Sequence, residues 1–135
     1  MLQTKHLERA LERLKEGWAR YLAHSNDEQL RDGLIQRFEF TYELSHKIIK
    51  RHLELTSASP DMYDRMDFAD IIRSASEKGV LEGNWRQWKK YRERRNLTSH
   101  TYNETNAKTV VQVIPEFISE IEYFLRKINE NDSKN

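Results

Sequence analysis

Polar side chains with complementary chemistry lie within one octapeptide of the sequence, RNLTSHTY, which spans residues 95–102. Arg95 brings a guanidinium that stays charged at physiological pH, and His100 brings an imidazole, a group that gains or loses a proton near neutrality. A guanidinium can hold the phosphate of an RNA chain, while an imidazole takes a proton from a 2′-hydroxyl or gives one to the leaving oxygen. These two groups are the ones needed for RNA cleavage without a metal ion.

The spacing of Arg95 and His100 restricts how the chain can bring them together. They lie five residues apart, which on an ideal helix separates them by about 140° around the axis. The two side chains therefore converge only if the helix ends or bends between them. Thr98, Ser99 and Thr101 favour such a break, because β-branched and hydroxylated residues compete with regular helical geometry. On its own, this pair of residues is a weak signal in a chain of 135 residues.

A cluster of positive charge precedes the octapeptide, within a chain of nearly balanced charge. The whole sequence has 23 basic and 22 acidic residues, which argues against a protein that coats nucleic acid through bulk charge. Between residues 86 and 95 the only acid is Glu93, and the basic residues there are Arg86, Lys89, Lys90, Arg92, Arg94 and Arg95. Trp85, Trp88 and Tyr91 could stack nucleobases beside this cluster. Aromatic residues at helical spacing more often form a core or a dimer interface, and we favour that interpretation here.

Other kinds of site find little support in the sequence. The remaining histidines have no metal-binding spacing, and we expect surface or half-buried positions for His6, His24, His46 and His52. Glu39 and Glu43 share one face of a long helix, where we expect both to be solvated. The sequence contains no glycine-rich phosphate loop, no nucleophile elbow and no cysteine. We therefore predict no metal site and no cofactor in this chain.

Apolar residues repeat at helical spacing along almost the whole chain. The pattern predicts helices over about residues 4–24, 27–55, 63–78 and 108–130, and another that follows Asn84 and reaches Arg95. No stretch has the pattern of a strand, and the chain contains only four glycines and two prolines. These features predict an all-α, antiparallel up-down bundle of four to five helices. This single domain would span residues 1–130, followed by a disordered tail over residues 131–135.

Local signals predict several helix ends. Asn26 is expected to cap the second helix, with Gln29 as its capping-box partner, and Asn84 is expected to cap the fourth. Gly79 is placed to end the third helix in a left-handed conformation. Pro115 is expected near the first turns of the last helix, because a proline in a helix interior costs about 3 kcal/mol.

The same sequence gives an expectation about the cellular compartment. The first twenty residues carry charge throughout and lack the apolar core of a secretory signal. No uninterrupted apolar segment has the length of a membrane span. The lack of cysteine is consistent with a reducing compartment. We expect a cytoplasmic protein that makes no membrane contact.

The octapeptide resembles a known motif. It is similar to the Arg-x4-6-His motif of the HEPN superfamily, whose members are small helical bundles that often dimerise, and in which a polar residue such as Asn96 usually follows the arginine. With Tyr102 it resembles the more specific motif of HepT-type toxins, which act with MntA-type minimal nucleotidyltransferase antitoxins. The stretches LERALERLKEGW, RFEFTYELSHKIIKRHL and VIPEFISEIEYFLRKI make the whole chain similar to nucleotidyltransferase substrate-binding proteins. That family shares its bundle with the C-terminal domain of kanamycin nucleotidyltransferase.

The resemblance implies roles for residues of the octapeptide and of the basic helix before it. Arg95 and His100 would be the catalytic pair of a ribonuclease, with two copies meeting across the cleft of a homodimer. Asn96 would support the arginine or contact the RNA. Lys89 and Arg92 are predicted to bind the substrate with it. The aromatic residues of this helix would be exposed in a monomer, which also favours a dimer.

Tyr102 would be the hydroxyl to which a separately encoded nucleotidyltransferase adds AMP. The added bulk and negative charge would repel RNA from the cleft. Mg²⁺ and ATP would belong to that partner, since this chain lacks the residues for nucleotidyl transfer. Two interpretations stay open: a HepT-like, metal-independent ribonuclease toxin, or a non-catalytic subunit that presents a substrate to the nucleotidyltransferase.

Overall fold

The computed structural model describes residues 2–133, with side chains up to residue 130. These residues form α1 (Lys5–Ala23), α2 (Glu28–Leu55), the 3-10 turn η1 (Pro60–Arg65), α3 (Phe68–Glu77), α4 (Trp85–Leu97), the 3-10 turn η2 (Thr98–His100) and α5 (Glu104–Ser133). The described part of the chain contains no strand. The predicted all-α bundle is therefore confirmed.

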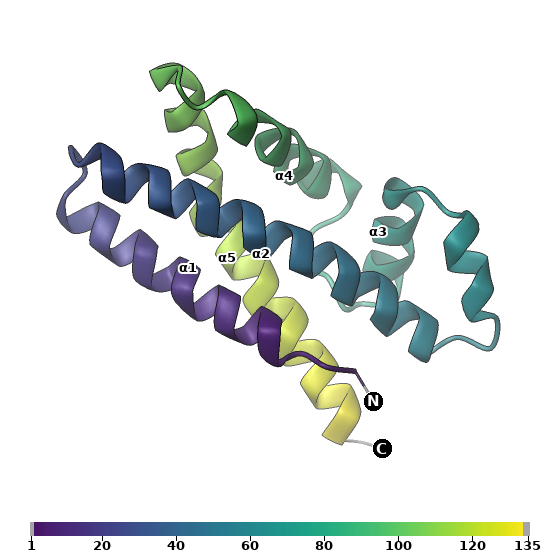
Figure 1. Ribbon diagram of the computed structural model, residues 1–135. Coiled ribbons are helices and arrows are strands. Elements are labelled where there is room, and N and C mark those ends of the chain that lie inside the picture. The colour runs from purple at the N-terminus through teal and green to yellow at the C-terminus, as the bar shows by residue number, and fades with distance from the viewer. Residues whose placement is uncertain (1, 134–135) are drawn as a thin grey trace.

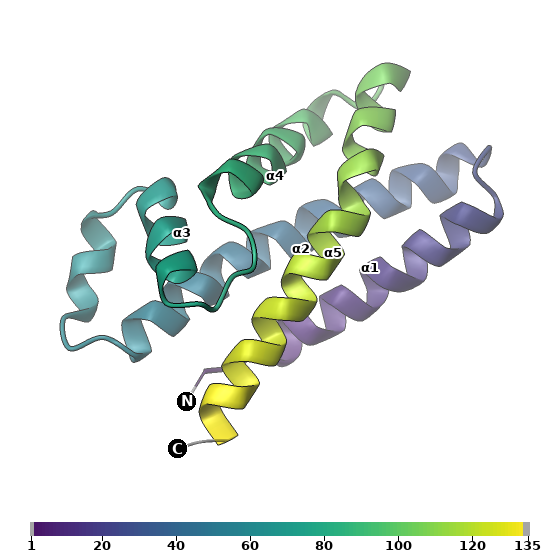
Figure 2. The ribbon, with the colours of Figure 1, turned by 180° about the vertical axis from the view of Figure 1, so that it is seen from behind.

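The long helices α1, α2, α4 and α5 build the bundle, and α3 with η1 covers one of its ends. Figure 1 shows α1 and α2 as an antiparallel pair, with α4 on the other side of α2. From behind, α5 crosses this layer and contacts α1, α2 and α4 (Figure 2). The turn η2 joins the end of α4 to the start of α5, so the octapeptide lies at one extremity of the bundle. No helix of the described chain combines the length and apolar character needed to cross a bilayer.

The apolar stripes predicted from the sequence are the buried faces of the helices. The core includes Leu7, Leu11 and Leu14 of α1, Leu34, Phe38 and Ile49 of α2, and Val110, Ile114, Phe117, Ile121 and Phe124 of α5. Trp88 and Tyr91 of α4 are also buried, and both rings pack edge-on against Phe117. These two aromatic residues belong to the core, as we favoured, so they offer no exposed patch to a second copy. The expectation that the aromatic residues of this helix are exposed in a monomer is therefore wrong for Trp88 and Tyr91.

Most of the predicted caps are present, but the cap of α2 is shifted by one residue. Asp27, and not Asn26, caps this helix: its carboxylate accepts hydrogen bonds from the backbone of Gln29 (2.9 Å) and Leu30 (3.1 Å). A carboxylate also complements the positive end of the helix dipole, which Asn26 could not do. The predicted cap at Asn84 is confirmed, and Gln87 completes a capping box there. Gly79 ends α3 with φ 77°, as predicted.

Two helices begin away from their predicted positions because of local caps. The third helix begins at Phe68 and not near residue 63, since the Asp67 carboxylate accepts from the backbone N–H of Asp70 at 2.9 Å. Residues 60–65 form η1 instead. The last helix begins at Glu104 and not near residue 108, where the Asn103 side chain accepts from the backbone of Asn106 at 3.2 Å.

The early start of α5 places Pro115 in the helix interior, contrary to expectation. The proline costs about 3 kcal/mol, but the neighbouring side chains of Ile114 and Phe117 are fully buried. Burial of these side chains on both sides of Pro115 offsets that cost. The backbone of residues 131–133 is helical, where we expected a disordered tail. Residues 134–135 of that predicted tail lie outside the described residues.

A buried carboxylate holds the segment that leads into α4. Glu120 of α5 is 2% exposed and accepts hydrogen bonds from Trp88 Nε1 (2.7 Å) and from the backbone of Glu82 and Gly83 (2.9 Å each). A Cβ at Gly83 would lie 3.0 Å from Glu120 Oε1, so a larger residue there would press on the carboxylate. Burial raises the pKa of Glu120. We call this group the Glu120 anchor.

Candidate functional site

The helix that carries Arg95 ends before it reaches His100. The α-helical part of α4 ends at Leu97, and η2 continues as a tighter 3-10 turn. The Thr98 hydroxyl lies 2.7 Å from the carbonyl oxygen of Arg95, within hydrogen-bond distance, and so competes with the regular helical pattern. The helix therefore ends between Arg95 and His100, as Thr98, Ser99 and Thr101 were expected to favour.

Arg95 is held by two carboxylates of α2. Its Nε donates to Glu43 Oε1 at 3.1 Å, and its Nη2 contacts both Glu43 Oε1 and, at 3.4 Å, Glu39 Oε1. The Thr98 hydroxyl accepts from Arg95 Nη1 at 3.4 Å and lies 3.0 Å from Glu39 Oε2. The hydrogen bond to Glu43 raises the pKa of Arg95. We call this group of four residues the Arg95 clamp.

We expected Glu39 and Glu43 to be solvated, but both form ion pairs with Arg95. Their spacing of four residues places both on one face of α2, and this face is turned toward the basic helix α4. The sequence contains both signals, the pair of glutamates and the cluster of arginines. The sequence alone does not show that Glu43 and Arg95, which are 52 positions apart, are in contact.

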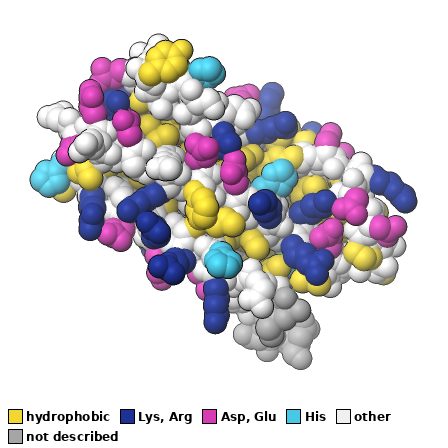
Figure 3. Space-filling view, in the orientation of Figure 1, with side chains coloured by type: hydrophobic (Ala, Val, Ile, Leu, Met, Phe, Trp, Pro, Cys, Tyr) yellow, Lys and Arg dark blue, Asp and Glu magenta, His cyan; other side chains and the backbone are white. Residues whose placement is uncertain are grey.

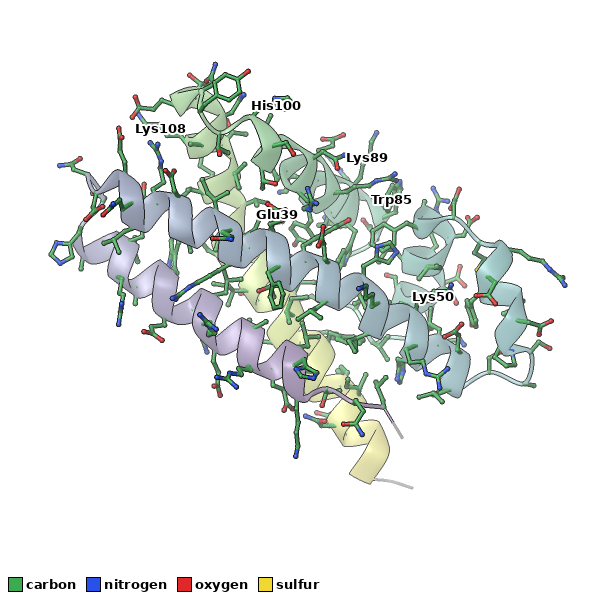
Figure 4. All side chains as sticks on the ribbon, viewed as in Figure 1. Glu39, Lys50, Trp85, Lys89, His100 and Lys108 are labelled. Atoms are coloured by element: carbon green, nitrogen blue, oxygen red, sulfur yellow. The ribbon has the colours of Figure 1, made fainter. Side chains whose placement is uncertain are left out.

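His100 lies at the exposed end of the bundle (Figure 4), and Tyr102 follows it in the turn between η2 and α5. The Tyr102 side chain is 88% exposed, and its ring lies edge-on to the His100 imidazole with 6.2 Å between centroids. The backbone carbonyl of His100 accepts from the Asn106 side chain at 3.1 Å, which fixes the turn into α5. Both functional groups of these side chains are therefore open to solvent and to a ligand.

Arg95 and His100 are not joined by a hydrogen bond within the described chain. The side chain of Arg95 turns to α2, while the ring of His100 contacts Tyr102. The chain therefore brings the two groups to the same end of α4 but gives each a different neighbour. A ligand that touches both must span from the Arg95 clamp to the end of the bundle.

The residues predicted to bind substrate lie along the exposed side of α4. Asn96, Arg92 and Lys89 are all exposed. In the basic cluster, Lys90 pairs with Glu116 and Arg94 with Glu93, whereas Arg86, Lys89 and Arg92 have no acidic partner among the described residues. Burial, with the charges of Arg92 and Lys50, lowers the pKa of His46 on the facing helix α2. This side of α4 is thus the part of the cluster with unneutralised charge.

The described residues contain no group of three or more His, Cys, Asp or Glu side chains arranged to hold a metal ion. The polar groups at the end of α4 are instead a guanidinium, an imidazole, a phenol and an amide. This set can bind a phosphate and move a proton.

A family model described as nucleotidyltransferase substrate binding protein like matches residues 2–130. The chain belongs to this family. The match confirms the resemblance to nucleotidyltransferase substrate-binding proteins that was inferred from the layout of the whole chain.

Individual relatives connect the family to a ribonuclease as well as to a nucleotidyltransferase. A Haemophilus influenzae protein named probable ribonuclease HepT is 38% identical over 100 residues, which cover 74% of this chain and 68% of that protein. A solved Haemophilus influenzae structure, described as revealing the fold of a substrate-binding domain of a nucleotidyltransferase, matches with a TM-score of 0.86 and 32% identity over 94% of this chain and 99% of that one. A Thermus thermophilus structure matches with a TM-score of 0.70 and 31% identity, covering 90% and 97% of the two chains.

Proposed function

We propose that this member of the nucleotidyltransferase substrate-binding family is a HepT-like toxin, a metal-independent ribonuclease that uses Arg95 and His100. The observation that carries the proposal is the Arg95 clamp. It holds a charged, partly exposed guanidinium at the end of α4, five residues before a solvent-exposed imidazole. The similarity to a probable ribonuclease HepT supports the same activity.

In the proposed reaction His100 takes the proton from a ribose 2′-hydroxyl, and the 2′-oxygen attacks the adjacent phosphorus. The bond from phosphorus to the 5′-oxygen breaks, and a second imidazole returns a proton to that leaving oxygen. The products are a 2′,3′-cyclic phosphate and a 5′-hydroxyl. Arg95 stabilises the additional negative charge on the phosphate in the transition state.

The need for two proton-transfer groups supports a homodimer. The octapeptide supplies one imidazole per chain, and no other histidine lies in its sequence. Two copies that meet at the ends of their α4 helices would supply one imidazole as base and one as acid. Light scattering should then give about twice the 16.3 kDa mass of the chain across a range of concentrations, and a constant monomer mass would contradict this part of the proposal.

A separately encoded nucleotidyltransferase of the MntA type, acting as the antitoxin, would switch the ribonuclease off at Tyr102. The phenol oxygen would attack the α-phosphate of ATP bound to that partner, forming a phosphodiester to AMP and releasing pyrophosphate. The high exposure of Tyr102 makes its hydroxyl accessible to a second protein. Its ring lies beside His100, so the new negative charge would be placed where RNA must enter.

Mass spectrometry after co-expression with the nucleotidyltransferase tests this modification. Adenylate is expected on the peptide that contains Tyr102 and not on the Tyr102→Phe protein. Tyr21, a partly buried tyrosine of α1, is the control position, and no adenylate is expected on its peptide. Equal labelling of wild type and Tyr102→Phe would contradict the role of Tyr102.

A second candidate function is a non-catalytic subunit that presents a substrate to the nucleotidyltransferase. It is favoured by the separate partners of Arg95 and His100, which do not contact each other within the described chain. Both functions need the same fold and the same partner. They differ in whether this chain breaks a bond.

RNA cleavage in EDTA distinguishes the two functions. Wild type is expected to cleave RNA, and His100→Ala is expected to lose about 100-fold or more of the rate, the usual contribution of a general acid or base. His24→Ala is the matched control, since His24 is an exposed histidine at the C-cap of α1, outside the octapeptide. Equal rates for wild type and His100→Ala, or no cleavage by wild type, would reject the ribonuclease.

A further inference from the structure

A second candidate site lies in a groove between α1 and α2, outside the Arg95 clamp. The groove has a volume of about 670 Å³, within the usual range for small-molecule sites. Its rim is formed by His6, Arg9 and Arg13 of α1 and by Gln36, Arg37 and Phe40 of α2. Figure 3 shows basic side chains around apolar ones on the face of the molecule where α1 and α2 lie. We call this hollow the α1–α2 groove.

All the charged side chains that line the groove are basic. No Asp or Glu is among the residues that line it. Arg9 and Arg13 have no acidic partner among the described residues, whereas the arginines with such partners are Arg20, Arg31, Arg51, Arg65, Arg73, Arg94 and Arg95. Arg9 and Arg13 lie four residues apart, an arrangement of like charges that costs helix stability. An anion bound between them would remove that cost.

Arg37 plays a different part from these two arginines. Its Nη1 donates to the backbone carbonyl of Arg13 at 2.7 Å, so it ties α2 to α1 and forms one wall of the groove. Its charge still adds to the positive potential of the hollow. Arg9 and Arg13 are the guanidinium groups that remain available to a ligand.

An aromatic ring faces solvent at the same place. Phe40 is 60% exposed, and the floor beside it is made by Ala10 and Leu44. The backbone at Gly33 leaves open space, since a Cβ there would meet no atom within 4 Å. An exposed aromatic face next to free guanidinium groups provides stacking for a base and charge for a phosphate.

We propose that the α1–α2 groove binds a nucleotide, with the base against Phe40 and the phosphate between Arg9 and Arg13. This chemistry is shared by a free nucleotide and by one nucleotide of an RNA strand. Phe40 lies three residues before Glu43, so the groove adjoins the Arg95 clamp on the surface of α2. Charge argues against a second copy as the occupant, because two grooves placed face to face would bring their arginines together.

Binding can be measured separately from cleavage, which keeps this inference distinct from the proposed ribonuclease. The His100→Ala protein is titrated into fluorescently labelled AMP, ATP and an oligoadenylate of about ten nucleotides, a length within the range of single-stranded sites. Phe40→Ala and the double variant Arg9→Ala, Arg13→Ala are then made in the same background. Arg126→Ala on α5 is the control that removes one exposed arginine elsewhere. Circular dichroism confirms that all variants are folded.

Both groove variants are expected to weaken binding by about tenfold or more, as loss of one stacked base usually does, with Arg126→Ala unchanged. Binding of AMP and ATP identifies a free nucleotide as the ligand, and binding of the oligoadenylate alone identifies an RNA strand. The inference is overturned if no probe binds, or if the groove variants bind as tightly as their parent. It is also overturned if light scattering shows that Phe40→Ala converts a dimer to a monomer, since the groove would then be an interface between copies.

Discussion

Carboxylates hold α4 at both of its ends, but in opposite surroundings. At the first end Glu120 is 2% exposed and accepts three hydrogen bonds from groups that are themselves fixed in the fold. At the other end Glu39 and Glu43 hold Arg95, and the side chains of these three residues are 38%, 52% and 23% exposed. The two ends therefore differ in whether water and ligands can reach the charged groups.

This difference separates a structural role from a functional one. The Glu120 carboxylate is buried, so its removal leaves the indole N–H of Trp88 unpaired in the core and takes the acceptor from two part-buried backbone N–H groups. Ion pairs at the surface contribute little stability, because water competes for both partners. The Arg95 clamp can therefore exchange a carboxylate for a phosphate group at small cost, whereas the Glu120 anchor cannot change partners.

The largest effect on stability is expected at the Glu120 anchor. Glu120→Ala should lower the free energy of unfolding by about 3 kcal/mol or more, because each unpaired buried donor costs about 1–3 kcal/mol. Urea unfolding measures the change. Glu116→Ala is the control, since its carboxylate on the same helix pairs with Lys90 at the surface and should cost about 1 kcal/mol or less. Similar losses for the two variants would remove the contrast between the ends of α4.

A smaller effect, on cleavage, is expected when the clamp loses one carboxylate. Glu43→Gln should lower kcat by about tenfold, because Arg95 would no longer be oriented by its strongest partner. KM should stay the same or fall, since one negative charge near the phosphate is removed. Steady-state cleavage kinetics separate the two constants. Glu93→Gln, which alters only the exposed pair with Arg94, is expected to leave both unchanged, and an equal kcat for Glu43→Gln and wild type would show that the clamp does not orient Arg95.

The smallest effect is a pH dependence of stability at the Glu120 anchor. Burial raises the pKa of Glu120 above its ordinary value of 4.5, so the folded protein binds this proton more tightly than the unfolded chain. The resulting stabilisation is fully present below pH 4.5 and is lost as pH rises through the folded-state pKa. Urea unfolding across this window should show a steeper decline for wild type than for Glu120→Gln. Parallel profiles would contradict the raised pKa.

The features of this molecule that could be predicted from the sequence are those that depend on residues close together in the sequence. The apolar stripes, the cap at Asn84 and the left-handed Gly79 are local features and are confirmed. The choice of Asp27 over Asn26 depends on the path of the chain between α1 and α2, because either side chain can cap a helix. The interior position of Pro115 reflects packing of α5, which outweighs local propensity.

The candidate site likewise combines local features, which the sequence predicts, with contacts between helices, which it does not. The break after Arg95 follows from Thr98 and its neighbours, and so it could be expected from the octapeptide. The partners of Arg95 could not, because Glu39 and Glu43 come from another helix and their contact depends on how α2 and α4 pack. The α1–α2 groove is missed for the same reason, since its two walls are separate helices whose exposed residues form no motif.

The most direct test of the account is to measure RNA cleavage and urea unfolding on the same preparation of Arg95→Ala. Cleavage in EDTA is expected to fall by about 100-fold or more, as for loss of one group that stabilises transition-state charge. The free energy of unfolding should stay within about 1 kcal/mol of wild type, as for a partly exposed ion pair. Cleavage at the wild-type rate per folded molecule, together with a large loss of stability, would show that the clamp only supports the fold and would contradict the account.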